Sequence, residues 1–210
     1  MIQIDTPPAE VRILALGDSY TIGEAVAVDE RWPVRLAAML RARGVHVADP
    51  TIVATTGWTT DELARGIDSA NPRRTFDVVT LLIGVNNQYR GRSSDEYRKQ
   101  FRSLLARAVG FAGGQPARVV VMSIPDWSVT PFAARRDRAH IAQEIDAFNA
   151  INRDEAKHAG ARYVDVTPIS RRAGVEPALL APDGLHPSGA MYAEWAAEAF
   201  PVVWGILGER

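Results

Sequence analysis

The feature that most constrains the fold is a regular alternation of short apolar runs with longer amphipathic stretches. Runs rich in β-branched residues predict strands, and apolar residues at helical spacing predict helices. The expected strands cover residues 11–16, 45–53 (with a break near Asp49-Pro50), 76–83, 118–124 and 162–166. The expected helices cover 27–43, 60–69, 95–112, 137–159 and 189–207, with Ser94 as one cap. Strands that alternate with helices form a parallel sheet with helices on both faces. The sequence therefore predicts an α/β fold of about five parallel strands, in a single domain over residues 1–210.

The composition excludes several classes of protein. The chain has 210 residues, of which 47% are apolar and 23% charged, as is typical of a globular protein that buries a full core. It has no cysteine, which excludes a disulfide scaffold, a thiolate metal site and a cysteine nucleophile. Its net charge of −1 provides no general attraction to nucleic acid or to an anionic membrane.

The start of the chain does not resemble a secretory leader. A leader has a basic segment followed by an apolar one, and here Asp5 and Pro7 interrupt the first residues. The longest apolar runs, such as residues 78–83, are far too short to span a bilayer. We therefore expect a cytoplasmic protein, monomeric or homodimeric, that binds a small molecule and neither nucleic acid nor membrane.

Polar side chains and glycines gather directly after the predicted strands. In a parallel sheet the carboxyl ends of the strands share one edge, and ligands bind there. Segments that are far apart in the sequence should therefore converge at that edge. They are Gly17-Asp18-Ser19-Tyr20, Gly57-Trp58, Gly84-Val85-Asn86-Asn87-Gln88, Pro125-Asp126-Trp127 and, before the last helix, Asp183-Gly184-Leu185-His186-Pro187.

These segments contain the parts that nucleophilic catalysis by a serine requires. Ser19 alone is an ordinary turn residue, and it becomes a nucleophile only beside a base and donors for an oxyanion. Asp183 precedes His186 by three residues, so a tight turn lets the carboxylate orient the imidazole. Asn86 and the N–H of Gly57 either close turns or stabilise an oxyanion.

Other carboxylates after the strands have a simpler interpretation. Asp18, Asp126 and Asp165 each follow a predicted strand, at the start of a turn. A carboxylate in such a position commonly accepts hydrogen bonds from the amides of its own loop. We expect this structural role for all three.

Four of these segments resemble, in set and in order, the four sequence blocks of the SGNH/GDSL hydrolases. They are Gly17-Asp18-Ser19-Tyr20, Gly57, Gly84-Val85-Asn86-Asn87 and Asp183-Gly184-Leu185-His186. The resemblance extends from residue 11 to about residue 195. It implies a three-layer, flavodoxin-like fold without a metal or an organic cofactor. Two positions depart from the family pattern: Tyr20 stands in place of Leu, and Asn87 in place of Asp.

The resemblance also implies a role for each matching residue. Ser19 would be the nucleophile, His186 the base, and Asp183 the group that orients the imidazole. The N–H groups of Ser19 and Gly57 and the side chain of Asn86 would form the oxyanion hole. The implied activity is that of a serine esterase.

The sequence says less about the substrate. The residues expected to line its pocket are Tyr20, Trp58, Asn87, Gln88, Tyr89 and Trp127. The segment 127–138 is either a solvated loop or a border of the site. In the second case Trp127 and Phe132 would line a pocket, and Arg135, Arg136 and Arg138 would hold an anionic substituent. No long apolar lid is evident, which favours a short-acyl or carbohydrate ester over a long-chain triglyceride.

Two alternatives to hydrolysis stay open. An acyltransferase would use the same three residues, and a non-catalytic domain would bind a small molecule at the same edge. Two further classes are disfavoured. The loop that begins at Gly17 has neither the glycine spacing nor the Gly-Lys ending of a phosphate-binding loop. A metallohydrolase would need His and Asp clustered at ligand spacing, which the sequence lacks.

Overall fold

The computed structural model describes residues 10–209, so the expectation based on Asp5 and Pro7 falls outside the described residues. Its sheet has five parallel strands in the order β2-β1-β3-β4-β5. The strands are β1 (Ile13–Gly17), β2 (Thr51–Ala54), β3 (Val78–Leu82), β4 (Val119–Met122) and β5 (Arg162–Val164). This order is that of flavodoxin-like sheets, so the predicted architecture is confirmed.

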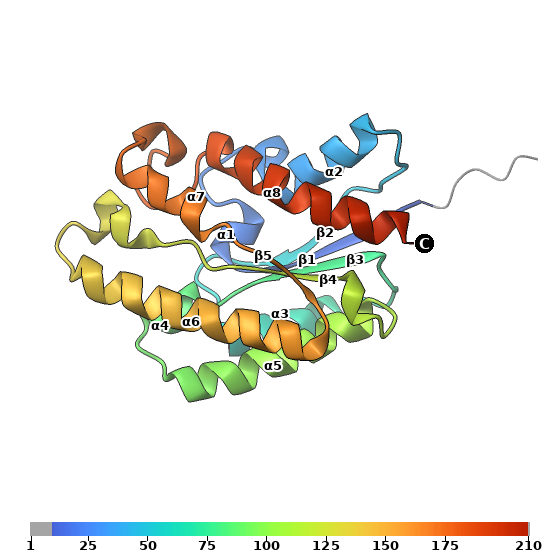
Figure 1. Cartoon of the computed structure of the whole chain (residues 1–210), viewed down its shortest axis with the longest axis horizontal. Helices are drawn as coiled ribbons and strands as arrows, with labels where there is room; N and C mark the ends of the chain where they lie inside the picture. Colours follow the sequence, from blue (N-terminus) through green and yellow to red (C-terminus); the bar gives the residue numbers. More distant parts are fainter. Residues whose placement is uncertain (1–9, 210) are drawn as a thin grey trace, which may run out of the picture.

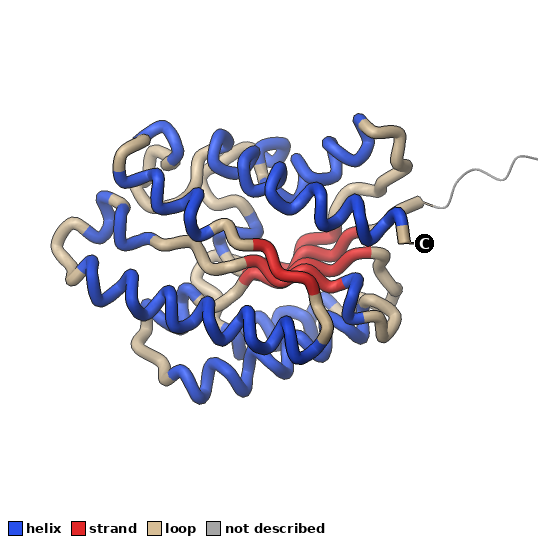
Figure 2. The backbone as a smooth tube through the Cα atoms, in the orientation of Figure 1, coloured by secondary structure: helices blue, strands red, loops and turns tan. Residues whose placement is uncertain are grey.

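Helices cover both faces of the sheet. They are α1 (Ser19–Ile22), α2 (Trp32–Ala42), α3 (Thr60–Ala70), α4 (Val85–Tyr89), α5 (Ser94–Phe111), α6 (Arg138–Ala159), α7 (Thr167–Arg171) and α8 (Gly189–Gly208). Figure 1 shows α2 and α8 on one face and α3, α5 and α6 on the other. Figure 2 shows the strands as one layer between these two layers of helices.

The core lies on both faces of the central strands. Every residue of β1 and β3 is buried, as expected for parallel strands enclosed by helices. The edge strands β2 and β5 are partly exposed. Residues that directly follow the central strands are therefore held by a rigid layer, which is a suitable support for a site.

Two predicted elements begin later in the structure than expected. The strand expected over 45–53 has its predicted break at Asp49-Pro50: regular pairing begins at Thr51, and before the break Val47 makes an isolated bridge to Val11. The helix expected from residue 27 begins at Trp32, after a short 3₁₀ turn at Val28–Glu30. Pro33 lies in its first turn, where a missing N–H has no cost.

Shorter features were also missed. Ser93, and not Ser94, caps α5, since its hydroxyl accepts a hydrogen bond from the N–H of Glu96 at 3.2 Å. The sequence did not predict α1, α4 and α7, which have only four or five residues each. Within residues 10–209, no helix combines the length and apolar character needed to cross a membrane.

Candidate active site

Ser19 is the first residue of α1, directly beyond the buried end of β1. Gly17 allows the tight turn, because a Cβ there would lie 2.5 Å from the carbonyl oxygen of Leu82 and 2.2 Å from the hydroxyl of Thr21. Asp18 caps the helix by accepting a hydrogen bond from the N–H of Tyr20 at 3.0 Å. Ser19 is therefore fixed at the edge of the sheet where ligands bind.

The turn between Asp183 and His186 has the geometry that its spacing predicts. Asp183 Oδ1 accepts hydrogen bonds from the N–H groups of Leu185 and His186, both at 2.9 Å, and Oδ2 lies 2.6 Å from His186 Nδ1. Burial raises the pKa of Asp183, but these hydrogen bonds from His186 and Leu185 outweigh it, and the net shift is downward. An ionised carboxylate at this distance accepts a hydrogen bond from Nδ1–H, so that in the neutral imidazole Nε2 is the acceptor.

Ser19 and His186 line the same pocket, which has a volume of about 190 Å³. Both side chains are almost fully buried, and within the described chain no hydrogen bond joins them directly. Such hydrogen bonds are often long before a substrate binds. The remaining lining residues are Tyr20, Thr56, Gly57, Val85, Asn86, Tyr89, Trp127, Phe132 and Leu185.

The order of the strands places one predicted oxyanion donor on each side of Ser19. Strand β1 lies between β2 and β3, so the loops that follow β2 and β3 flank the turn that follows β1. The first loop brings Gly57, whose φ of +86° is a left-handed conformation suited to glycine. The second brings Asn86, and one N–H of its amide donates to the carbonyl of Trp58 at 3.0 Å. All three predicted oxyanion donors thus belong to the same pocket.

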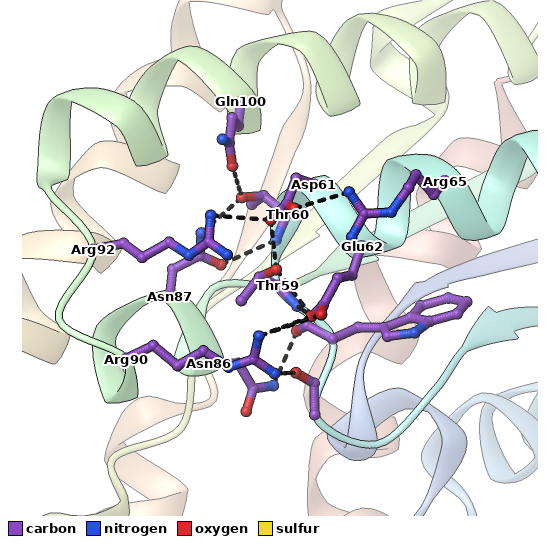
Figure 3. A network of polar contacts seen from close by, with 12 residues as sticks. Thr59, Thr60, Asp61, Glu62, Arg65, Asn86, Asn87, Arg90, Arg92 and Gln100 are labelled. Atoms are coloured by element: carbon purple, nitrogen blue, oxygen red, sulfur yellow. Dashed lines mark hydrogen bonds and ion pairs between the residues drawn. The ribbon is translucent and has the colours of Figure 1, made fainter.

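Helix α4 holds the Gly57 loop through a polar network (Figure 3). Arg90 donates to the carbonyl of Gly57 at 2.7 Å and pairs with Glu62 at 3.2 Å. Asn87 accepts from the N–H of Thr60 at 3.0 Å and donates to the Thr60 hydroxyl at 2.7 Å. The oxygen and the nitrogen of the Asn87 amide therefore both bond to Thr60, at the start of the helix that follows the Gly57 loop.

The pocket residues predicted from the sequence divide into two groups. Tyr20, Tyr89 and Trp127 line the pocket, whereas Trp58, Asn87 and Gln88 are not among the lining residues. The Trp58 indole packs against Gly66 of α3. Gln88 instead accepts a hydrogen bond from Trp127 Nε1 and donates one to Glu144, both at 2.8 Å.

Sequence reasoning missed several residues of this site. Thr56, Val85 and Leu185 line the pocket, and each is the sequence neighbour of a residue that was predicted. Arg90 was also missed, although it lies one helical turn after Asn86, a spacing that places two side chains on the same face. That spacing was the only available signal.

The three turn carboxylates have the expected structural role. Asp126 accepts from the N–H of Ser128 at 2.9 Å and Asp165 from that of Thr167 at 3.2 Å, as Asp18 does from Tyr20. No three side chains of the kinds that ligate metals converge within residues 10–209.

The burial of Asp18 can be tested by the pH dependence of stability. It is fully buried, its Oδ2 has no hydrogen-bond partner in the described part of the chain, and burial raises its pKa to about 7. Because the folded-state pKa exceeds the unfolded one, the folded protein binds more protons between about pH 4 and pH 7. The contribution of Asp18 to stability therefore falls as the pH rises through this interval.

Replacing Asp18 with Asn removes this titration and keeps an oxygen for the N–H of Tyr20. We expect Asp18→Asn to increase Tm more at pH 8 than at pH 5, with a difference of about 3 °C or more between the two increments. Thermal unfolding of both proteins at each pH measures it. Equal increments at the two pH values would contradict the raised pKa.

Comparisons with known proteins bear on the fold and on the family. Three solved structures share the fold. TesA is 17% identical, with a TM-score of 0.72 over 93% of this chain and 99% of that chain. The psychrotrophic esterase EstA from Pseudoalteromonas sp., inhibited by monoethylphosphonate, is 17% identical, with a TM-score of 0.70 over 94% of this chain and 98% of that chain. The acetylxylan esterase Axe2 from Geobacillus stearothermophilus is 18% identical, with a TM-score of 0.70 over 92% of this chain and 94% of that chain. No curated protein matches the sequence. The model of the GDSL-like Lipase/Acylhydrolase family matches residues 15–194. The chain therefore belongs to the GDSL-like lipase/acylhydrolase family and is a carboxylic ester hydrolase.

Proposed function

We propose that the protein is a serine esterase that hydrolyses small esters with a short acyl group, including carbohydrate esters, through an acyl-enzyme on Ser19. One observation carries this proposal. Ser19, His186 and the candidate oxyanion donors Gly57 and Asn86 line one small pocket, although they come from separate parts of the sequence, and Asp183 contacts His186 from outside the pocket lining.

Each residue has a defined step in the proposed reaction. His186 Nε2 takes the proton of the Ser19 hydroxyl as its oxygen attacks the ester carbonyl, and Asp183 stabilises the imidazolium that forms. The N–H groups of Ser19 and Gly57 and the amide of Asn86 stabilise the tetrahedral oxyanion. His186 then protonates the leaving alcohol, and the same steps with water release the acid.

The size of the pocket supports a small acyl group. Pockets for drug-sized ligands have volumes of about 300–1,000 Å³, and this pocket has about 190 Å³. A short acyl chain therefore fits inside, and the rest of a larger ester extends past the mouth. The similar structure of an acetylxylan esterase agrees with an acetyl group and a sugar alcohol.

Hydrolysis of p-nitrophenyl acetate, butyrate and octanoate tests the proposal. We expect kcat/KM for acetate and butyrate to exceed that for octanoate by roughly tenfold or more. The outer methylenes of the octanoyl chain do not fit in the pocket, so they gain no burial energy and hinder productive binding. A fluorophosphonate should add one label per chain, on the Ser19 peptide, and this label should stop turnover. A label on another residue, or turnover that survives full labelling, would overturn the proposal.

The same assay separates hydrolysis from acyl transfer. With glycerol or a sugar as a second acceptor, an acyltransferase would form mainly the new ester, whereas the proposed esterase would form mainly the free acid. Product analysis by mass spectrometry distinguishes the two results.

A further inference from the structure

Three aromatic rings form one wall of the pocket. Tyr89 ends α4, and Trp127 and Phe132 belong to two short 3₁₀ turns between β4 and α6. The three ring centroids lie 5.6 Å to 6.2 Å from one another. Trp127 is buried, whereas Tyr89 and Phe132 are 44% and 45% exposed and therefore stand at the mouth of the pocket.

This aromatic wall is held in place before any substrate binds. Gln88 accepts a hydrogen bond from Trp127 Nε1 and is itself held by Glu144. The N–H of Phe132 donates to the carbonyl of Gly184, in the turn that carries His186, at 3.3 Å. A substrate that leaves the pocket along this wall therefore meets a preformed surface.

One guanidinium group covers all three rings. Arg136 Cζ lies 4.8 Å from the Tyr89 centroid, 5.5 Å from that of Trp127 and 5.7 Å from that of Phe132. Its Nη2 donates to the Tyr89 hydroxyl at 3.0 Å, which orients the guanidinium at the rim of the wall. The side chain is exposed to solvent.

The charge of Arg136 has no carboxylate partner in the described part of the chain. Its neighbours in sequence and space use their carboxylates elsewhere: Asp137 caps α6 through the N–H of His140, and Glu144 contacts Gln88 and His140. Arg90, also near the pocket, differs because it pairs with Glu62. Arg136 thus keeps most of its five donors available beside the mouth.

We propose that Arg136 is a specificity residue that binds an anionic group on the alcohol portion of the ester. The proposal rests on the proposed function, since it takes Ser19 as the nucleophile. The pocket holds a short acyl group, so the alcohol portion passes Tyr89 and Phe132 and reaches the guanidinium. A guanidinium binds a carboxylate or a phosphate through paired hydrogen bonds, and stacking on the rings fixes its plane.

A matched pair of acetate esters tests the proposal. In 4-acetoxybenzoate and 4-acetoxybenzamide the leaving alcohols have nearly the same shape, but only the first carries a charge. Arg136→Gln removes the positive charge and keeps a polar side chain. The sequence also made Arg135 a candidate for holding an anion, but within residues 10–209 only the guanidinium of Arg136 lies over the three rings. Arg135→Gln therefore removes the same charge from the preceding exposed residue and serves as the control. For each ester, we divide the kcat/KM of the variant by that of the wild type, and this ratio cancels the different intrinsic reactivities of the two esters.

We expect Arg136→Gln to lower kcat/KM for 4-acetoxybenzoate by roughly tenfold or more, mainly through KM, because a charge-assisted pair is lost. The kcat/KM for 4-acetoxybenzamide should change less than twofold. Arg136→Lys should recover part of the loss in kcat/KM for 4-acetoxybenzoate. Arg135→Gln should change neither substrate by more than about twofold, since exposed charges act weakly at a distance.

Three results would overturn the proposal. Equal losses on both esters would assign Arg136 to support of the aromatic wall. Equal losses in Arg135→Gln would indicate a general electrostatic field. A wild-type preference for a neutral acetylated xyloside over 4-acetoxybenzoate, unaffected by Arg136→Gln, would mean that the rings stack on a sugar. Each of these results leaves the turnover of p-nitrophenyl acetate by the wild type normal, whereas failure of the proposed function would abolish that turnover and the Ser19 label in the wild type.

Discussion

Replacing Ser19 with alanine is expected to lower kcat for p-nitrophenyl acetate by about 10⁴–10⁶-fold. The variant keeps the pocket and the oxyanion donors but has no hydroxyl to attack the carbonyl. His186→Ala should cost a similar factor, because the hydroxyl is a weak nucleophile without a base. The double variant should be little worse than either single one, since residues that act as a unit are not additive.

Two exposed residues of the same types provide controls for this first prediction. Ser103 lies on α5 and His158 near the end of α6, and both are exposed. Ser103→Ala and His158→Ala should each leave kcat within about twofold of the wild type, as expected for surface substitutions away from special features. Steady-state kinetics with equal Tm values for all variants would complete the comparison. Near-normal turnover in folded Ser19→Ala or His186→Ala would contradict the assigned roles.

Replacing Asn86 with alanine is expected to lower kcat by about 10²–10³-fold. The amide would donate to an oxygen that becomes negative only in the transition state, so KM for p-nitrophenyl acetate should change much less than kcat. Asn86→Asp has nearly the same shape and presents a negative charge instead of a donor. It should therefore be at least as damaging at pH 8.

The Asn86 variants also need a measurement that reports on a tetrahedral species directly. Asn86 donates to the carbonyl of Trp58, so its loss also weakens the loop that carries Gly57. Phosphonylation of Ser19 by the fluorophosphonate forms a tetrahedral adduct, and its rate should fall in parallel with kcat/KM. A loss of less than tenfold in kcat, or an unchanged phosphonylation rate, would remove Asn86 from the oxyanion hole.

The arrangement of the sheet could be predicted because its signals are local. The run over β3 is apolar on both faces, and long helices such as α6 show clear periodicity between a cap and a terminal glycine. The candidate residues Ser19, Gly57 and Asn86 were identified for a related reason: each follows a strand, and parallel strands bring their carboxyl ends together. Asp183 and His186, which precede α8, were identified instead by their three-residue spacing. The shared order of the motif segments with a known family strengthened this prediction.

Other parts of the site could not be predicted, because they depend on contacts between distant segments. Arg90 reaches Gly57 from 33 residues away, and no periodic pattern reports such a pair. Helix α4 itself is only five residues long, too short for its apolar spacing to be recognised. The orientation of Trp58 toward Gly66 is likewise set by tertiary packing, since sequence proximity to Gly57 suggested the opposite.

The sheet order divides the site into two portions that evolution or engineering can change separately. The loops after β1, β2 and β3 supply Ser19, Gly57 and Asn86, whereas the segment after β4 supplies Trp127, Phe132 and Arg136. Only the second portion is confined to the wall of the pocket. Libraries restricted to residues 127–136 should therefore yield new substrate preferences on an unchanged catalytic apparatus, provided that the hydrogen bond between Phe132 and Gly184 is kept.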